Sequence, residues 1–410
     1  MVGRRLRTLA LVSGLGATVM FAGTPSALAN PNDTEPLTMV CAAAPSACDA
    51  ITGPQGEPGP TGATGQAGPA GEQGPQGQQG MQGPAGPAGS AVRATVATGA
   101  QHSCSLTSAG GVLCWGDNKF GQLGNGSTVA SSASPVHVTG LDSGVIALSS
   151  GSYHTCAVTN AGAVLCWGRN SSGQLGNGAS TDANAPAAVP ALSSGVTAIT
   201  AGYGHTCAVT TTGSAMCWGL NTNGQLGTGS VSGKTPTTAP QQVTGLSTGV
   251  SSISAGFMHT CAVTAIGAAK CWGLNNTGQL GNGKLKDSAK PVQVTGLTSG
   301  IASISAGYTH TCVVTQAGGA GCWGYNGKGQ VGSGTAGHKP MAVTPVNGLP
   351  GGVLEISAAS VGDDLKANGQ HTCAVTTTAG AECWGNNADG ELGEGSTTQQ
   401  NQPAMVLKQH

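Results

Sequence analysis

The chain has 410 residues and a formal net charge of −1, and only 8% of its residues are charged, against about 25% in an ordinary soluble domain. Its 71 glycines make up about 17% of the chain, against a usual ~7%. This composition argues against a nucleic-acid partner, which would need clustered lysines and arginines. It predicts a surface built from Ser, Thr, Asn, Gln and Gly.

Residues 1–29 have the three parts of a secretory signal peptide. Three arginines (Arg4, Arg5 and Arg7) precede an apolar run, and Ala27-Leu28-Ala29 fits a cleavage site. The apolar run is shorter than the ~20 residues that a membrane span needs. We therefore expect an extracellular protein, secreted or associated with the cell surface, with no integral membrane segment in the mature chain. Loss of the three arginines would change the formal net charge from −1 to −4.

Residues 53–91 carry glycine at every third position for thirteen consecutive triplets. Only glycine fits at the axis of three wound polyproline-II chains, so this period predicts a collagen-like triple-helical stalk and a homotrimer; a flexible Gly/Pro linker would not need it. Proline stands at the third triplet position only once, at Pro58, which favours a bacterial host without prolyl hydroxylation. In the polar linker at residues 30–52, Cys41 and Cys48 either close a local loop or join the chains at the head of the stalk.

One motif recurs six times between Cys104 and Gly395: His-Ser/Thr-Cys, a Cys-Trp-Gly ten residues after that cysteine, and a segment related to Gly-Gln-Leu-Gly-x-Gly. The first cysteines of successive repeats are 52, 51, 54, 51 and 61 residues apart. In the third repeat, residues 196–202, 205–210, 214–219 and 240–246 have the character of short strands, the last beginning at Pro240. Residues 92–410 are therefore predicted to form an all-β propeller of four-stranded blades, six in number, or seven if unrecognised segments complete another.

Hairpin geometry predicts how the cysteines pair. In the second repeat, residues 159–163 suit a three-residue loop with Gly162 in the left-handed region, which sets Cys156 opposite Cys166. At such a non-hydrogen-bonded site the Cα atoms lie ~4.5–5.5 Å apart, within reach of a disulfide. The sixth repeat has Ala379 and then Gly380, so its turn should differ. We expect the disulfides Cys104–Cys114, Cys156–Cys166, Cys207–Cys217, Cys261–Cys271, Cys312–Cys322 and Cys373–Cys383. A metal site is disfavoured, because each His-x-Cys with its facing cysteine supplies three ligands where zinc takes four.

The other repeated residues are expected to be structural. The six histidines of the motif should be buried and hydrogen-bonded to backbone, because six identical settings do not make one catalytic centre. The tryptophan of each Cys-Trp-Gly should pack between adjacent blades, and the Gln of Gly-Gln-Leu-Gly should reach nearby backbone.

These repeats resemble those of the regulator of chromosome condensation family, through segments such as HTCAVT, CWGxN and GQLGxG. The resemblance covers residues 92–410 and implies a propeller of four-stranded blades, usually seven; we favour six. The name-giving member is a guanine-nucleotide exchange factor for a small nuclear GTPase. A secreted, charge-poor chain would not meet that partner, so exchange activity is not expected here. Another member is a secreted bacterial inhibitor of β-lactamases, whose repeats are shorter and lack these cysteine pairs.

The leading functional expectation is a bacterial binding or adhesion protein that presents disulfide-linked propellers on a trimeric stalk to a protein or glycan. The alternative is an inhibitor of an extracellular enzyme. No enzyme activity, catalytic residue, metal or cofactor is expected. The sixth repeat carries an insertion of nine residues relative to the fifth, which adds Asp363, Asp364 and Lys366; we expect this loop to mark the binding face.

Overall fold

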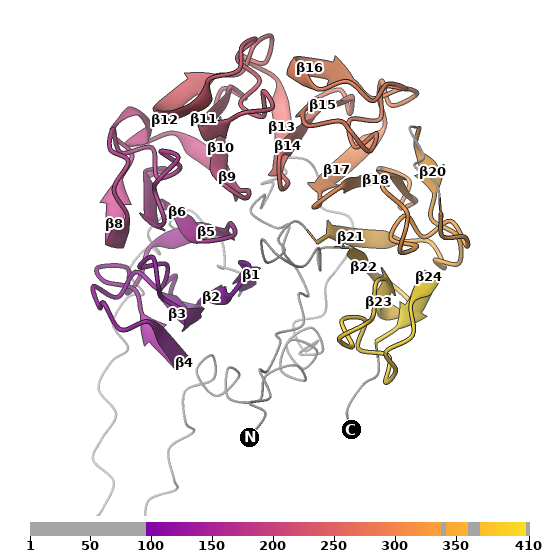
Figure 1. Ribbon diagram of the computed structural model, residues 1–410, viewed down its shortest axis with the longest axis horizontal. Coiled ribbons are helices and arrows are strands. Elements are labelled where there is room, and N and C mark those ends of the chain that lie inside the picture. Colours follow the sequence, from indigo (N-terminus) through magenta and orange to yellow (C-terminus); the bar gives the residue numbers. More distant parts are fainter. Residues whose placement is uncertain (1–95, 338–341, 360–369, 407–410) are drawn as a thin grey trace, which may run out of the picture.

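The computed structural model describes residues 96–337, 342–359 and 370–406. The signal peptide, the linker with Cys41 and Cys48, the stalk, and Asp363, Asp364 and Lys366 lie outside the described residues. Six antiparallel four-stranded sheets form the described part, with one short 3-10 helix, η1 (Pro190–Leu192). Figure 1 shows the six sheets as blades around a common axis. The all-β propeller with six blades is thus confirmed.

Each blade uses its strands in chain order from the axis outward. The innermost strands are β1 (Val96–Thr98), β5 (Val145–Ser150), β9 (Val196–Ala201), β13 (Val250–Ala255), β17 (Ile301–Ala306) and β21 (Val353–Ala358). The second strands are β2 (His102–Leu106), β6 (His154–Thr159), β10 (His205–Thr210), β14 (His259–Thr264), β18 (His310–Thr315) and β22 (His371–Thr376). The third strands are β3 (Val112–Asp117), β7 (Val164–Gly168), β11 (Ala215–Asn221), β15 (Ala269–Gly273), β19 (Ala320–Gly324) and β23 (Gly380–Gly385). The outermost strands are β4 (Ser131–His137), β8 (Ala183–Ala188), β12 (Gly233–Gln242), β16 (Ser288–Gln293), β20 (Thr344–Pro345) and β24 (Gln400–Met405).

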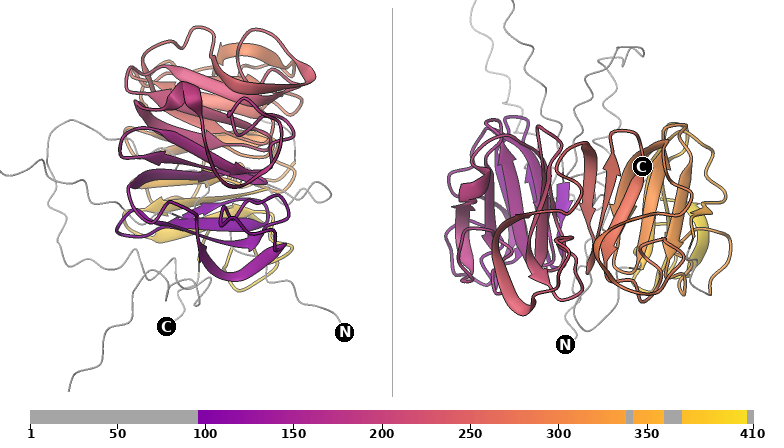
Figure 2. Two further views of the ribbon diagram at one scale, coloured as in Figure 1. Left: turned by 90° about the vertical axis from the view of Figure 1, so that its left-hand side faces the viewer. Right: turned by 90° about the horizontal axis from the view of Figure 1, so that it is seen from above.

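The strands run between the two faces of a disc, as the side views in Figure 2 show. We call one face the turn face, because it carries the short turns between the first and second strands, such as residues 202–205. The opposite one, the hairpin face, carries the turns between the second and third strands, such as residues 210–214. Because β1 runs from the hairpin face toward the turn face, Val96, the first described residue, lies at the hairpin face.

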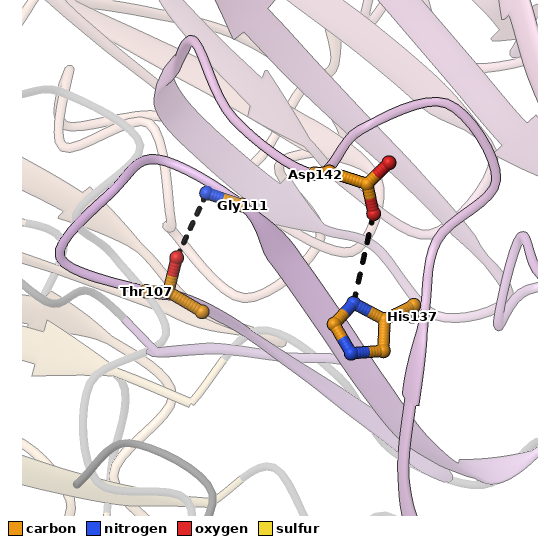
Figure 3. Close-up of polar contacts among 4 residues, drawn as sticks. All are labelled: Thr107, Gly111, His137 and Asp142. Atoms are coloured by element: carbon orange, nitrogen blue, oxygen red, sulfur yellow. Dashed lines mark hydrogen bonds and ion pairs between the residues drawn. The ribbon is translucent and has the colours of Figure 1, made fainter. Parts of the chain in front are cut away.

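The hairpin predicted from the second repeat is confirmed. Thr159 N donates to Ala163 O over 2.9 Å, and Gly162 has a φ of 74° in the left-handed region, which favours glycine. The threonine hydroxyl strengthens the turn by accepting the N–H four residues on, as Thr107 Oγ1 does from Gly111 N at 2.9 Å (Figure 3). The sixth turn differs as expected: Thr376 Oγ1 accepts instead from Ala379 N, and the positive φ, 81°, lies at Gly380.

All six expected disulfides are present: Cys104–Cys114, Cys156–Cys166, Cys207–Cys217, Cys261–Cys271, Cys312–Cys322 and Cys373–Cys383. In each hairpin the two cysteines are direct cross-strand partners. Their Cα atoms lie 4.0–4.1 Å apart, slightly closer than expected. The sixth bridge forms although its turn differs, because both turn types leave three residues between the paired positions.

The fourth strand of the third blade was predicted wrongly. It was expected at residues 240–246 with Pro240 first, but β12 covers Gly233–Gln242 and the Val-Thr-Gly-Leu segment after it turns back toward β11, where Ala215 N donates to Leu246 O. Pro240 therefore stands near the end of the strand. This is tolerated because β12 is an edge strand, in which every second N–H faces away from the ladder.

Neighbouring blades pack a disulfide of one against the tryptophan of the next. Successive side chains on a strand point to opposite sides, so Cys166 faces the following blade while Trp167 faces the preceding one. Cys156 and Cys166 accordingly share a buried cluster with Trp218 of the third blade, and four further clusters repeat this arrangement. Each of these five tryptophans is fully buried, and its Nε1 donates to the Gln main-chain carbonyl of the preceding blade at 2.9–3.0 Å. The prediction that tryptophans pack between blades is confirmed for these five.

The first and sixth blades each lack a neighbouring blade on one side among the described residues. The cluster around Cys373 and Cys383 contains Leu392 and Val406 but no tryptophan, and Trp115 of the first blade is only half-buried. Figure 1 shows these two blades further apart than successive blades. Blade-to-blade packing therefore runs through five interfaces in the described part of the chain.

This difference predicts unequal costs for the same substitution. Trp218→Ala should lower the free energy of unfolding by about 3–5 kcal/mol, because it opens a cavity between two blades and removes the hydrogen bond from Trp218 Nε1 to Gln174 O. Trp115→Ala should cost less than half as much, since Trp115 is half-buried at an end blade. Urea unfolding followed by circular dichroism measures both. Equal losses would contradict the end-blade description.

Candidate binding face

Five of the six repeated histidines (His102, His154, His205, His259 and His310) link blades to one another through a threonine hydroxyl, where bonds to backbone had been expected. His154 Nε2 lies 2.9 Å from Thr206 Oγ1 of the next blade, and four equivalent contacts span 2.8–2.9 Å. The imidazole nitrogen instead meets a threonine hydroxyl on the second strand of the next blade. The buried imidazole also leaves no room for a side chain at the glycine three residues earlier, because a Cβ at Gly202 would lie 2.6 Å from His205 Cε1.

The hydrogen-bond network assigns the proton on these rings. Thr206 Oγ1 gives its single hydrogen to Gln174 O at 2.8 Å, so His154 Nε2 must be the donor toward Thr206. The other ring nitrogen, Nδ1, is buried with no hydrogen-bond partner. Burial lowers the pKa of His154 to about 3, with smaller contributions from neighbouring His102 and His205. These histidines are thus neutral structural donors at pH 7.

Two further observations concern ionisable side chains outside the histidine network. No group of three or more His, Cys, Asp or Glu side chains suited to a metal ion occurs among residues 96–337, 342–359 and 370–406. Sequence reasoning missed Glu355, whose carboxyl has a pKa that burial raises to about 7. Glu355 lies on β21 where the fourth and fifth blades have Ser252 and Ser303, so comparing the repeats would have found it.

The turn face carries a row of aromatic side chains that sequence reasoning also missed. Tyr203, Phe257 and Tyr308 occupy equivalent turn positions in the third, fourth and fifth blades and are all half-buried. The ring centroids of Tyr203 and Phe257 lie 4.5 Å apart, and those of Phe257 and Tyr308 lie 4.2 Å apart. We call these three residues the aromatic rim. The first and second blades have Ala100 and Ser152 at the same position, so the rim covers only part of the turn face.

Backbone hydrogen bonds between successive turns hold the rim in place. Phe257 N donates to Gly307 O at 3.1 Å and Tyr308 N donates to Ala359 O at 2.7 Å. Ala359 is the last described residue before the inserted loop, and the chain returns at Gln370. The loop that was expected to mark the binding face therefore leaves and rejoins the propeller on the turn face, beside Tyr308. Asp363, Asp364 and Lys366 themselves lie outside the described residues.

A second aromatic group lies on the same face at the first two blades. Phe120 and Tyr153 meet edge to face with centroids 5.4 Å apart, and the Arg169 guanidinium lies 5.1 Å from the Phe120 centroid. The hairpin face differs: there His137 and Asp142, both more than three-quarters exposed, form a pair at 3.7 Å (Figure 3). Recognisable aromatic surface is thus concentrated on the turn face.

A family model described as an RCC1-like domain matches residues 59–409. The chain belongs to the RCC1-like domain family. Among curated relatives, this RCC1-like domain protein is 33% identical to the ultraviolet-B receptor UVR8 of Arabidopsis thaliana over 319 residues, 76% of this chain and 69% of the receptor. It is also 33% identical to the human probable E3 ubiquitin-protein ligase HERC6 over 264 residues, 62% of this chain but 25% of the ligase.

Solved structures confirm the fold of the RCC1-like domain. Human WBSCR16 superposes with a TM-score of 0.67 at 22% identity, covering 77% of this chain and 82% of that one. Yeast Prp20, bound to Kap60, gives a TM-score of 0.66 at 21% identity, covering 76% and 74%. At these identities the likeness establishes the propeller and nothing about partners. No described helix is long and apolar enough to cross a membrane.

Proposed function

We propose that this RCC1-like domain protein is an exported, non-enzymatic binding or adhesion protein that presents the turn face of its propeller to a partner. One observation carries the proposal: the repeats stop being equivalent on the turn face, where the aromatic rim contacts Ala359, the last described residue before the insertion. A symmetric scaffold needs neither feature. Loops and exposed aromatic residues on a rigid scaffold are typical of binding sites.

The direction of the chain supports this orientation. Val96 lies at the hairpin face, so a stalk formed by residues 53–91 would hold the turn face away from its own attachment. A triple-helical stalk would carry three propellers, and linkage of three weak sites raises the apparent affinity through local concentration. The relatives named as a receptor and a ubiquitin ligase favour a binding or regulatory role.

The test uses the mature full-length protein, fluorescently labelled, on intact bacterial and mammalian cells in flow cytometry. Replacing residues 358–370 by Thr-Gly-Ala-Gln, the turn of the first blade, removes the insertion without adding an aromatic residue. We expect saturable binding to cells, reduced about tenfold by this replacement with an unchanged melting temperature. The matched control, His137→Ser on the hairpin face, should bind like the parent protein.

Equal binding by the shortened and parent proteins would refute the loop's role in this face. Absence of saturable cell binding, together with tight capture of one purified secreted enzyme such as a β-lactamase, would favour an enzyme inhibitor instead. Sedimentation of the mature protein as a monomer at low temperature would refute the trimeric stalk.

A further inference from the structure

The aromatic rim has surroundings that restrict its ligand. In the blades that carry it, the neighbouring turn positions are Gly204, Met258 and Thr309, and the residues after each Cys-Trp-Gly are Leu220, Leu274 and Tyr325. None of these side chains is charged. Charged residues occupy the equivalent position only in the first two blades, as Asp117 and Arg169. Among the described residues at these turn positions, an ionic ligand would therefore find no opposite charge.

Hydrogen-bonding groups without partners lie next to the rim. Thr309 follows Tyr308, and its Oγ1 is buried without a hydrogen-bond partner. Gln279 Nε2 is also buried without a hydrogen-bond partner. The Gln279 side chain lies beside Thr309, because Thr277 Oγ1 contacts both: it is 2.6 Å from Gln279 Oε1 and 3.1 Å from Thr309 O. Buried donors are normally satisfied, so their combination with an exposed aromatic surface indicates a ligand that brings acceptors.

We propose that the aromatic rim binds a neutral carbohydrate chain, which lies against the strip formed by Tyr203, Phe257 and Tyr308 and turns sugar hydroxyls toward Thr309 and Gln279. This proposal rests on the proposed binding function and names its ligand class. The C–H bonds on one side of a pyranose carry partial positive charge, and an aromatic face carries negative charge, so the two attract each other. A neutral sugar needs no ion pair, and its hydroxyls both donate and accept hydrogen bonds.

The row of rings suits an extended ligand. Three side chains from three consecutive blades, with centroids 4.2–4.5 Å apart, form a continuous strip and not an enclosed cavity. A chain of several sugars can contact such a strip along its length. A proline-rich peptide also docks on aromatic surfaces, but Val96, the first described residue after the Pro-rich segment, lies at the opposite face. We therefore favour the carbohydrate, and a peptide becomes an outcome of the test.

The experiment measures binding of cellohexaose, chitohexaose and maltohexaose to the mature full-length protein by isothermal titration calorimetry. At least one should bind, and Phe257→Ala should weaken it about tenfold, whereas Phe257→Tyr should keep it within about threefold. Phe120→Ala, an aromatic substitution on the same face outside the rim, is the matched control and should leave affinity unchanged. Circular dichroism should show that each variant is folded.

Two results would overturn the assignment. One is that none of these oligosaccharides binds although Phe257→Ala abolishes binding to cells, in which case the turn face still functions but not through neutral sugars. The other is that a proline-rich peptide binds in a rim-dependent way and the oligosaccharides do not. Sugar binding that survives Phe257→Ala would place the sugar elsewhere on the protein. Because cell binding and sugar binding are measured separately, failure of this inference differs from failure of the proposed function.

Discussion

Mature protein unfolded in urea and reduced should fail to refold when the urea is removed in the presence of reductant. Each of the six disulfides closes a short loop between cysteines ten residues apart, worth about 2–3 kcal/mol on the chain-entropy model. Their sum exceeds 10 kcal/mol, about the whole stability of a typical domain. Tryptophan fluorescence reports the outcome, since the burial of five indoles depends on blade packing.

Single bridges provide the control for this prediction. Replacing both Cys373 and Cys383 by alanine removes the one bridge whose cluster contains no tryptophan among the described residues, and it should leave the protein folded, with a loss of about 2–3 kcal/mol. The same change at Cys207 and Cys217 should cost more, because this pair packs against Trp272 and leaves a cavity there. Full recovery of native fluorescence in reductant would show that the hairpins do not need their bridges.

Mild acid should destabilise the protein steeply. Burial lowers the pKa of His102 to about 4 and that of His205, His259 and His310, like His154, to about 3. Below pH ~6.5 the unfolded chain protonates these five side chains while the folded chain does not. Each then removes about 1.4 kcal/mol of stability per pH unit, until the pH reaches its folded pKa.

Two carboxyls act in the opposite direction. Burial raises the pKa of Glu355 to about 7 and also raises that of Glu382. Burying these carboxyls in the ionised form costs folding free energy, and this cost falls as the pH decreases toward 4.5. Five histidines against Glu355 leave a net loss of about 5 kcal/mol between pH 7.5 and pH 5.5, and Glu382 makes this loss smaller. Urea midpoints at the two pH values measure it.

A matched pair of variants separates the histidine network from general acid effects. His205→Gln should reduce the pH dependence by about 1.4 kcal/mol per unit, although it weakens the protein at pH 7.5 by loss of the contact with Thr260. His137→Gln, at a side chain 76% exposed, should leave the pH dependence unchanged. Identical slopes for the His205→Gln variant and the parent would contradict the burial of neutral imidazole.

The sequence by itself determined the features that depend on neighbouring residues. The spacing of Thr159, Gly162 and Ala163 specifies the hairpin loop, and a strand period of two then places Cys156 opposite Cys166. Six copies of this unit predicted six blades with their disulfides. The expected role of Asp363, Asp364 and Lys366 and the collagen-like stalk remain predictions, because they lie outside the described residues.

Only the tertiary structure decided which groups of different blades meet. The repeat period brings residues about fifty apart into contact, but it does not say which atoms face each other across an interface. His154 therefore forms its hydrogen bond with the Thr206 hydroxyl, where a backbone partner had been expected. The fourth strand of the third blade likewise begins at Gly233 and not at Pro240. Tyr203, Phe257 and Tyr308 are single letters in separate turns. They form one surface because the innermost strands approach the axis, where equivalent positions of adjacent blades come within contact distance.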